Sequence, residues 1–330
     1  MFGLWGSWQA GGTLSERMIQ GWLKTLLPTP TPVSEEIGDP ETARTLILVY
    51  NTMWNGPLGW KEIEIPESCA LTTNRSYLEK ATAVVFHIPT LGRMPAPKPN
   101  QQLWVGWTLE CDLNISRQRS KSFMKQFDLV ISYKLDSDIP ALYVPGGPDI
   151  VEELTAPPAE KSELAAAFIS SSINQSGRCQ YLRELMKHMP VHSYGKTLNN
   201  RKLESDQGWD SKREALKKYR FTVAFENAVA PDYVTEKFFH PLSSGSVPIY
   251  LGAPNVEQFA PGDNCYLNVR DFTGPEELAR RLLELAADDE QYNELLAWKK
   301  RPLRPGFLEM VERTNENVWV RLIQKVQERR

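Results

Sequence analysis

The chain has 330 residues, and its 38 Lys and Arg against 41 Asp and Glu give a formal net charge of −3 at pH 7. With 41% hydrophobic and 24% charged residues it has the composition of an ordinary globular protein, which excludes fibres and extensive disorder. The near balance of charge argues against a nucleic acid partner, because a protein with a nucleic-acid-binding surface usually has an excess of basic residues. At about 100–200 residues per domain, the length allows two domains.

The four cysteines lie far apart without a CxxC pair, which predicts unpaired thiols in a reducing compartment: Cys69, Cys111, Cys179 and Cys265. The N-terminal stretch contains no run of the roughly 18 apolar residues that a membrane-spanning helix needs. We therefore expect a cytoplasmic protein with no signal peptide, no membrane anchor and at most peripheral membrane contact.

The first half of the chain reads as one helix followed by short strands. Apolar residues four apart predict an amphipathic helix over 15–27, which ends at the Pro-rich stretch 28–32. Four β-rich runs then predict buried strands at 46–50, 83–87, 103–107 and 129–133. The Pro-rich segment 95–99 is expected to be a loop, and 143–158 a crossing between two domains.

Strands and helices alternate in the second half. Strands are predicted at 166–170, 191–194, 221–225, 247–251 and 265–269. Helices are predicted at 177–189, 212–218, 235–242 and 275–285. Repeated βα units of this length imply a parallel sheet with helices on both faces, and ligands bind such sheets at the carboxyl ends of the strands.

The C-terminal segment 299–330 predicts an amphipathic helix. Its apolar face carries Trp319, Leu322, Ile323 and Val326, and its other face is basic. We expect this face to pack on the body of the protein; attraction to an anionic membrane surface is the alternative. The predicted organisation is a first domain over 1–155, a second over 156–305 and a C-terminal helix over 306–330.

The densest group of polar residues lies at a predicted strand-to-helix turn. The strand 221–227 ends in Glu-Asn, and 232–237 opens the next helix with Lys237 in its first turn. Unpaired helix N–H groups and a lysine ammonium could hold a diphosphate without a metal. The alternative is simple helix capping by Thr235 and Glu236, which leaves Lys237 unexplained because its charge opposes the helix dipole.

Arg178 occupies the corresponding place in an earlier βα unit, where its guanidinium could fork onto phosphate oxygens. A solvated surface arginine is the alternative. In the first half, Glu110 follows a predicted strand at the presumed cleft. One carboxylate suffices as the general base of an inverting transfer. A surface glutamate or a structural ion pair is the competing interpretation.

Asp136 and Asp138 form an Asp-x-Asp pair after a strand, a pattern with which many glycosyltransferases hold Mg²⁺ or Mn²⁺. Such pairs also arise by chance in turns, and we do not expect a metal here. Trp54, Trp60, Trp104 and Trp107 lie near predicted loops and strand ends, where indole faces suit sugar rings. Core packing is the commoner use of tryptophan.

Several ordered segments together resemble the α-1,3/4-fucosyltransferase family, over roughly residues 44–300. They are Trp107–Glu110, Ser132–Ile139, His192–Lys196, Tyr219–Asn227, Asp232–Lys237, Gly245–Pro254 and Asp271-Phe272. The resemblance implies an α/β GT-B architecture: two Rossmann-like domains facing a cleft, with the acceptor bound largely by the first and GDP-β-L-fucose by the second. It also implies inverting transfer to a GlcNAc-containing glycan, without a metal or other cofactor.

Carried over by position, Glu110 is the general base, and Arg178 and Lys237 are the diphosphate-binding cations. Donor contacts fall on Asn227, Tyr233 and Glu236, with Tyr194 near the nucleotide.

The chain departs from the family at Cys111-Asp112, where Ser-Pro is common, and at Ala228, where Ser is common. The first departure affects the loop around the predicted base. Two other functions therefore stay open: a metal-dependent glycosyltransferase that uses Asp136 and Asp138, and a non-catalytic module that binds a nucleotide or a glycan.

Overall fold

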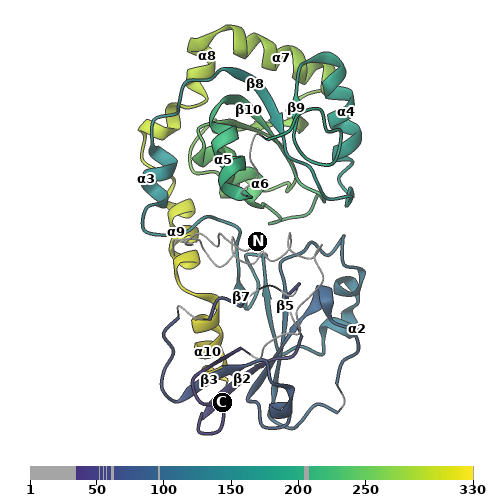
Figure 1. The fold of residues 1–330 in the computed structure, drawn as a ribbon, viewed down its shortest axis with the longest axis vertical. Helices are drawn as coiled ribbons and strands as arrows, with labels where there is room; N and C mark the ends of the chain where they lie inside the picture. The colour runs from purple at the N-terminus through teal and green to yellow at the C-terminus, as the bar shows by residue number, and fades with distance from the viewer. Residues whose placement is uncertain are drawn as a thin grey trace, which may run out of the picture.

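The computed structural model describes residues 35–51, 53–54, 56, 58–60, 63–95, 97–203 and 208–329. The predicted helix over 15–27 and the Pro-rich stretch after it lie outside these residues. The described chain forms two lobes stacked along the long axis of the molecule (Figure 1). We call residues 35–140 together with the last helix the first lobe, and residues 163–300 the second lobe.

The first lobe is built on a seven-stranded sheet of order β1-β3-β2-β4-β5-β6-β7, in which all neighbours are parallel except β1 and β3. Its central strands read as nearly unbroken apolar runs because both faces of a parallel sheet are covered. The strands are β1 (Glu36–Ile37), β2 (Thr45–Val49), β3 (Cys69–Thr72), β4 (Ala83–His87), β5 (Leu103–Thr108), β6 (Leu129–Ser132) and β7 (Ile139–Pro140).

The four strands predicted in this half are confirmed as β2, β4, β5 and β6, within one residue at each end. The strand β3, whose four residues are all buried, was not predicted. It is short, and Pro66-Glu-Ser just before it resembles a turn. The edge strands β1 and β7 have two residues each and carry no apolar pattern of their own. A short helix, α2 (Lys121–Met124), precedes β6.

The second lobe holds a five-stranded parallel sheet of order β12-β11-β10-β8-β9. The strands are β8 (Glu163–Ala167), β9 (His192–Ser193), β10 (Tyr219–Phe225), β11 (Val247–Leu251) and β12 (Leu267–Asn268). The helices are α4 (Arg178–His188), α5 (Trp209–Lys217), α6 (Glu236–Ser243), α7 (Pro275–Ala287) and α8 (Asp289–Glu294). The predicted βα alternation is confirmed, although β8 begins three residues earlier than predicted.

The crossing between the lobes contains a helix that was not predicted, α3 (Ile150–Thr155). It lies between β7 and β8, within the segment that the sequence marks as a connection. The boundary at residue 155 and the division of ligands between the two domains stay predictions.

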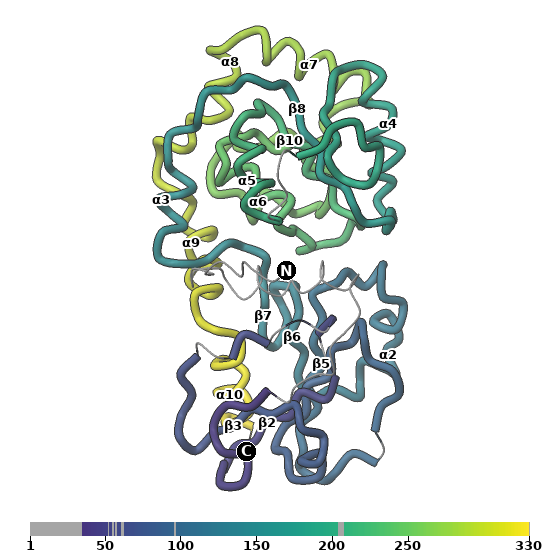
Figure 2. The backbone as a smooth tube through the Cα atoms, viewed as in Figure 1, coloured from purple at the N-terminus to yellow at the C-terminus, as the bar shows by residue number. Residues whose placement is uncertain are grey.

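The C-terminal segment returns to the first lobe. Two helices, α9 (Pro305–Asn315) and α10 (Val318–Glu328), run down one side of the molecule from the second lobe to the first (Figure 2). The prediction of a single helix is therefore wrong, because a second helix begins after Asn317, whose side chain accepts from the N–H of Trp319. The predicted packing is confirmed, since the apolar face of α10 is buried against the first sheet. There Trp319 packs edge-on against Trp60 and at a tilt against Trp107, and its indole N–H donates to the carbonyl of Leu58 at 3.0 Å.

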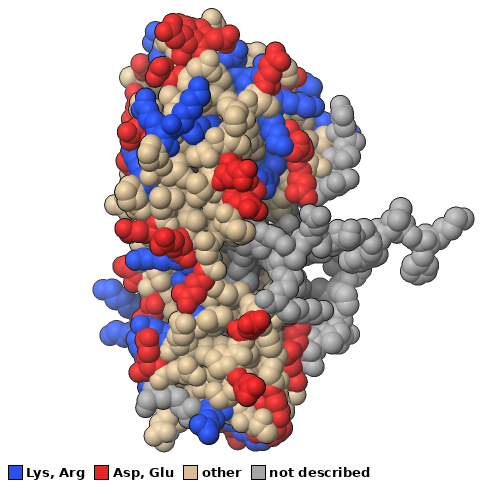
Figure 3. Space-filling view, turned by 90° about the vertical axis from the view of Figure 1, so that its left-hand side faces the viewer, with Lys and Arg blue, Asp and Glu red and all other residues tan. Residues whose placement is uncertain are grey.

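The surface matches the balanced composition. On the face in Figure 3, Lys and Arg are interspersed with Asp and Glu over both lobes. All four cysteines are unpaired, as predicted. No helix in the described part of the chain is long and apolar enough to cross a bilayer.

Candidate active site

Segments that follow the carboxyl ends of the two sheets meet between the lobes. Glu110 lies two residues beyond β5, and Asn227 two residues beyond β10. Hydrogen bonds from Asn114 and Tyr233 connect these segments across the interface. The predicted base therefore lies at the junction of the lobes, where ligands of parallel sheets bind.

The carboxylate of Glu110 is held through one oxygen. Its Oε1 accepts from the Tyr233 hydroxyl at 2.6 Å, from Nδ2 of Asn114 at 2.9 Å and from the backbone N–H of Cys111 at 3.1 Å. The residue is only 5% exposed and makes no ion pair within the described ranges. Both alternatives from the sequence, a surface glutamate and an ion-paired one, are therefore wrong.

Tyr233 reaches from the second lobe into the first. Its ring packs edge-on against Tyr133 at 5.0 Å and Tyr143 at 6.3 Å. Burial, with the neighbouring Glu110, raises the pKa of Tyr233 well above its usual range, so the hydroxyl keeps its proton and donates. This structure thus places a predicted donor-contacting residue against the predicted base.

Asn227 and Asn114 form the second connection between the lobes. Nδ2 of Asn114 donates to Oδ1 of Asn227 at 2.9 Å, in addition to its bond with Glu110. The sequence analysis did not select Asn114, because a lone asparagine in a loop carries no local signal. Its role is visible only in the folded chain.

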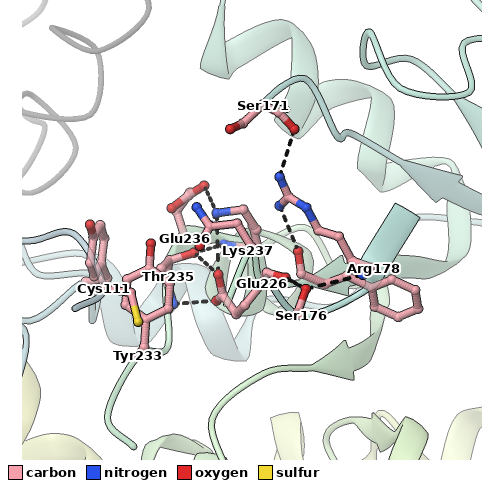
Figure 4. Close-up of polar contacts among 12 residues, drawn as sticks. Cys111, Ser171, Ser176, Arg178, Glu226, Tyr233, Thr235, Glu236 and Lys237 are labelled. Carbon is pink, nitrogen blue, oxygen red and sulfur yellow. Dashed lines mark hydrogen bonds and ion pairs between the residues drawn. The ribbon is translucent and has the colours of Figure 1, made fainter. Parts of the chain in front are cut away.

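The start of α6 holds a compact cluster of charges (Figure 4). Nζ of Lys237 lies 3.0 Å from Glu236 and 3.5 Å from Glu226, and it also donates to Thr235 Oγ1 at 2.9 Å. Glu226 is fully buried and accepts from the backbone N–H and the hydroxyl of Thr235. Thr235 is the N-cap of α6, so capping is confirmed for it, yet capping does not account for Lys237.

The pKa values in this cluster show how strongly its members interact. Burial works against the charge on Lys237, but Glu236 and Glu226 outweigh it and raise its pKa. Burial also works against ionisation of Glu236, but Lys237 and Lys212 outweigh it and lower its pKa to about 2. Burial raises the pKa of Glu226 despite the nearby ammonium. The side chain of Lys237 stays 21% exposed, so it can reach a ligand.

Arg178 is buried rather than solvated, with 1% exposure, so the surface alternative is wrong. Its guanidinium donates to the carbonyl oxygens of Phe225, Ser171 and Ile173 at 3.0–3.3 Å. It therefore ties the loop after β8 to the end of β10, as Figure 4 shows in part. Its buried Nε has no partner among the described residues. Arg178 therefore places a positive charge near the cluster at the start of α6, while the N–H groups of its guanidinium donate to backbone carbonyls.

Tyr194 follows β9 and stacks on Phe168 at 4.8 Å with an interplanar angle of 12°. Its hydroxyl bonds to that of Tyr219 at 2.7 Å. Gly195 is required beside it, because a Cβ there would lie 2.2 Å from the carbonyl oxygen of Ile169. The result is a half-exposed aromatic pair at the same edge of the second sheet.

Lys212 is a cation that the sequence analysis missed. It lies in the first turn of α5, and its Nζ is 4.8 Å from the ring centre of Trp209 and 5.7 Å from that of Phe168. Burial, only partly offset by Glu236, lowers its pKa to about 8. The rule that selected Lys237 and Arg178, a cation at a helix start after a strand, would have found it.

The remaining candidates lie away from this junction or in the core. Asp138 accepts from the backbone N–H of Val130 at 2.9 Å and pairs with Arg329 at 3.4 Å. No group of three or more metal-binding side chains occurs in the described ranges. Trp60, Trp104 and Trp107 are buried, so core packing is confirmed for them.

Comparison with known proteins agrees with the family that the sequence resembles. The family model "Fucosyltransferase, N-terminal" matches residues 42–144, and "Glycosyltransferase family 10 (fucosyltransferase) C-term" matches residues 158–330. The chain is 31% identical over 296 residues to the 3-galactosyl-N-acetylglucosaminide 4-alpha-L-fucosyltransferase FUT3 of Pan troglodytes, covering 84% of this chain and 76% of the relative. Membership of the family follows from these matches.

Two further relatives are longer than this chain. Alpha-(1,3)-fucosyltransferase B of Drosophila melanogaster is 31% identical over 285 residues, covering 79% of this chain and 64% of the relative. A fucosyltransferase-like protein of Arabidopsis thaliana is 38% identical over 204 residues, covering 62% and 37%. The chain thus spans less than two thirds of the length of either.

The fold is that of solved fucosyltransferases. A crystal structure of an alpha1,3-fucosyltransferase with GDP-fucose aligns with a TM-score of 0.54 at 18% identity, covering 91% of this chain and 96% of the other. A second crystal structure of an alpha1,3-fucosyltransferase aligns with a TM-score of 0.51 at 18% identity, covering 80% of this chain and 83% of the other. The predicted GT-B architecture is confirmed, and the chain belongs to the α-1,3/4-fucosyltransferases of glycosyltransferase family 10.

Proposed function

We propose that the protein transfers L-fucose from GDP-β-L-fucose to a hydroxyl of a GlcNAc-containing glycan, forming an α-1,3 linkage with inversion. Relatives whose names specify fucosyl transfer to N-acetylglucosaminides support this substrate class. The observation that carries the proposal is the placement of Glu110: a buried carboxylate at the junction of the lobes, hydrogen-bonded to Tyr233 of the lobe that also holds Lys237.

Glu110 is proposed as the general base. The attacking hydroxyl gives its proton to the carboxylate while its oxygen bonds to the anomeric carbon of fucose and the bond from that carbon to the phosphate oxygen breaks. The three hydrogen bonds that the described residues make to the carboxylate of Glu110 all use Oε1, and Oε2 is proposed to face the acceptor. No cation pairs with this carboxylate within the described ranges.

The leaving GDP is proposed to be stabilised by the second lobe. Lys237, in the first turn of α6, is proposed to balance the charge that develops on the diphosphate, and the buried Arg178 adds a second positive charge nearby. Asn227, Tyr233 and Glu236 are proposed to contact the donor. Tyr194, stacked on Phe168, is proposed to lie near the nucleotide.

We propose that transfer needs no metal. Asp138 already binds Val130 and Arg329, which argues against the Asp-x-Asp pair as a cation site. Activity unchanged in EDTA is the expected result, and loss of activity restored by Mg²⁺ or Mn²⁺ would support the metal-dependent alternative. A cytoplasmic location with at most peripheral membrane contact also stays a proposal.

The decisive experiment is Glu110→Gln, which keeps the shape and removes the base. GDP binding measured by calorimetry should be unchanged, while transfer to a panel of GlcNAc-containing acceptors should fall by roughly 10³-fold or more. Asp112→Asn, two positions along the same loop, is the matched control and should retain most of the rate. Wild-type protein that binds GDP without transferring to any acceptor would support the non-catalytic alternative. The linkage of the product is then assigned by NMR.

A further inference from the structure

We infer that Asn114 is a positioning residue for the base: its side-chain amide orients the carboxylate of Glu110 and connects it to the donor-binding lobe through Asn227. This inference rests on the proposed function of Glu110. Asn114 has no counterpart among the residues that the sequence singles out, and it takes no direct part in the proposed chemistry.

The geometry requires a primary amide at this position. Nδ2 of Asn114 carries two N–H groups, and it donates at 2.9 Å to Oε1 of Glu110 and at 2.9 Å to Oδ1 of Asn227. Both partner atoms are acceptors, so an aspartate, serine or alanine at 114 could not make both bonds. One side chain thus spans the interface and determines where the carboxylate points.

The bond to Glu110 leaves the reactive oxygen free. Asn114, Tyr233 and the N–H of Cys111 all donate to Oε1, and these three bonds resist rotation of the carboxylate about its last torsion. Without Asn114, Oε1 keeps only the hydroxyl of Tyr233 and the backbone N–H of Cys111 as described donors. The carboxylate then samples orientations in which Oε2 faces away from an acceptor hydroxyl, and the rate falls.

Asn114 is not fully satisfied by these contacts. Its Oδ1 is buried and has no partner among the described residues. A residue retained only for stability would be expected to use both ends of its amide, because a buried acceptor without a donor destabilises the fold. The arrangement is therefore better suited to orienting Glu110 than to stabilising the loop.

Gln118 offers a matched comparison within the same loop. Its Nε2 donates to Thr108 Oγ1 at 2.9 Å and to the main-chain oxygen of Glu110 at 3.1 Å. It supports the backbone of Glu110 without contacting the carboxylate. A purely structural effect should therefore appear in Gln118→Ala as well as in Asn114→Ala, whereas an effect on carboxylate orientation should appear only in the latter.

The first test separates turnover from donor binding. Asn114→Ala should lower kcat by about ten- to hundredfold, the range expected for a lost hydrogen bond to a charged group. The Kd for GDP should stay within about twofold of wild type, since the side-chain amide of Asn114 donates to Glu110 and Asn227 and not to Lys237. An unchanged kcat would overturn the inference.

The second test uses non-additivity. If Asn114 acts only through Glu110, adding Asn114→Ala to Glu110→Gln should not lower the residual rate further. An equal loss in both backgrounds would show that Asn114 acts independently and would overturn the inference. If Glu110→Gln alone keeps most of the turnover, the proposed base fails; if it abolishes turnover and Asn114→Ala has no effect, only the present inference fails.

The third test measures the pH dependence of kcat/KM, and it also serves if Asn114→Ala fails to fold. Asn114→Asp is nearly isosteric and puts a second carboxylate beside Oε1, and two such groups do not both ionise readily. The acidic limb of kcat/KM should move to higher pH by about one unit or more, whereas Gln118→Ala should leave the profile in place. An unmoved limb in folded Asn114→Asp protein would overturn the inference.

The tyrosines and the thiol near Glu110 do not titrate in that range, and Asp112 on the same loop, which pairs with Lys134 at 3.6 Å, is unchanged in the Asn114 variants. Burial raises the pKa of both Tyr233 and Tyr143 well above 10, and it raises that of the Cys111 thiol to about 11. Glu226 and Glu236 lie further off, in the cluster at the start of α6. Both are unchanged in the Asn114 variants, so their titration is common to all profiles.

Discussion

The carboxyl edges of the two sheets differ in how their charged side chains are paired. At the edge of the first sheet, Glu110 is held by neutral donors and pairs with no cation in the described ranges. At the edge of the second, Lys237 is surrounded by the carboxylates of Glu236 and Glu226. Among the described residues, the same topological position thus carries a single unpaired acid in one lobe and a lysine between two carboxylates in the other.

The difference follows from what each edge is proposed to do. A general base must keep its lone pair available, and a neighbouring cation would lower its basicity. A diphosphate site works best when its cations are already in place before the ligand binds. Carboxylates such as Glu226 hold the lysine ammonium in that position, so little conformational entropy is lost on binding. Variants that change one lobe's packing, charge or hydrogen bonds at a time test this comparison.

The largest expected effect is on the stability of the first lobe alone. Trp319→Ala removes a fully buried indole that packs on Trp60 and Trp107, and should lower the free energy of unfolding by about 3–5 kcal/mol. Chemical denaturation measures this, with Leu283→Ala on the exposed side of α7 as the control. GDP binding to folded protein should persist, since the cluster at α6 is in the other lobe; loss of GDP binding in folded Trp319→Ala would contradict the separation of roles.

Lys237→Met is the next largest. It leaves Glu226 and Glu236 without their shared cation, and it removes the charge proposed to bind the diphosphate. We expect GDP affinity to fall by about a hundredfold, or ~3 kcal/mol, as measured by calorimetry. Lys237→Arg keeps the charge and should lose far less. Similar losses in both variants would mean that shape, and not charge, is recognised at this edge.

Tyr233→Phe should have a smaller effect, confined to turnover. It removes the 2.6 Å hydrogen bond to Glu110 and keeps the ring that packs on Tyr133. We expect kcat to fall by about tenfold, or ~1.4 kcal/mol, with GDP affinity little changed. Steady-state kinetics and calorimetry give the two numbers. A fall in GDP affinity instead would place Tyr233 with the cations of the second lobe rather than with the base.

The smallest effect is on the pH dependence of GDP binding. The pKa of Lys212 is lowered to about 8 by burial, so this side chain is charged below that pH and loses its proton above it. If its charge assists diphosphate binding, affinity should fall by up to about tenfold between pH 7 and 9.5. Lys212→Arg stays charged throughout and should flatten the profile. Identical profiles for the two proteins would remove Lys212 from the donor site.

Local signals were enough to predict most of the fold and to select the candidate site residues. The strands over 83–87 and 247–251 appear where predicted, because buried parallel strands must be apolar on both faces. Glu110 and Lys237 could be selected because each follows a strand at the edge where ligands bind. Where the pattern was short, as in β3, or interrupted, as at Asn317 between the two last helices, the prediction failed.

The sequence by itself determined the two-sheet architecture, the family and the choice of candidate site residues, because these depend on local periodicity and on motifs within a few residues. Only the tertiary structure decided their partners. Tyr233 and Glu110 are 123 residues apart, Asn114 and Asn227 are 113 apart, and the guanidinium of Arg178 turned out to bind backbone carbonyls. Such contacts form when distant segments are brought together by burial of the two cores, and no local pattern specifies which side chains then meet.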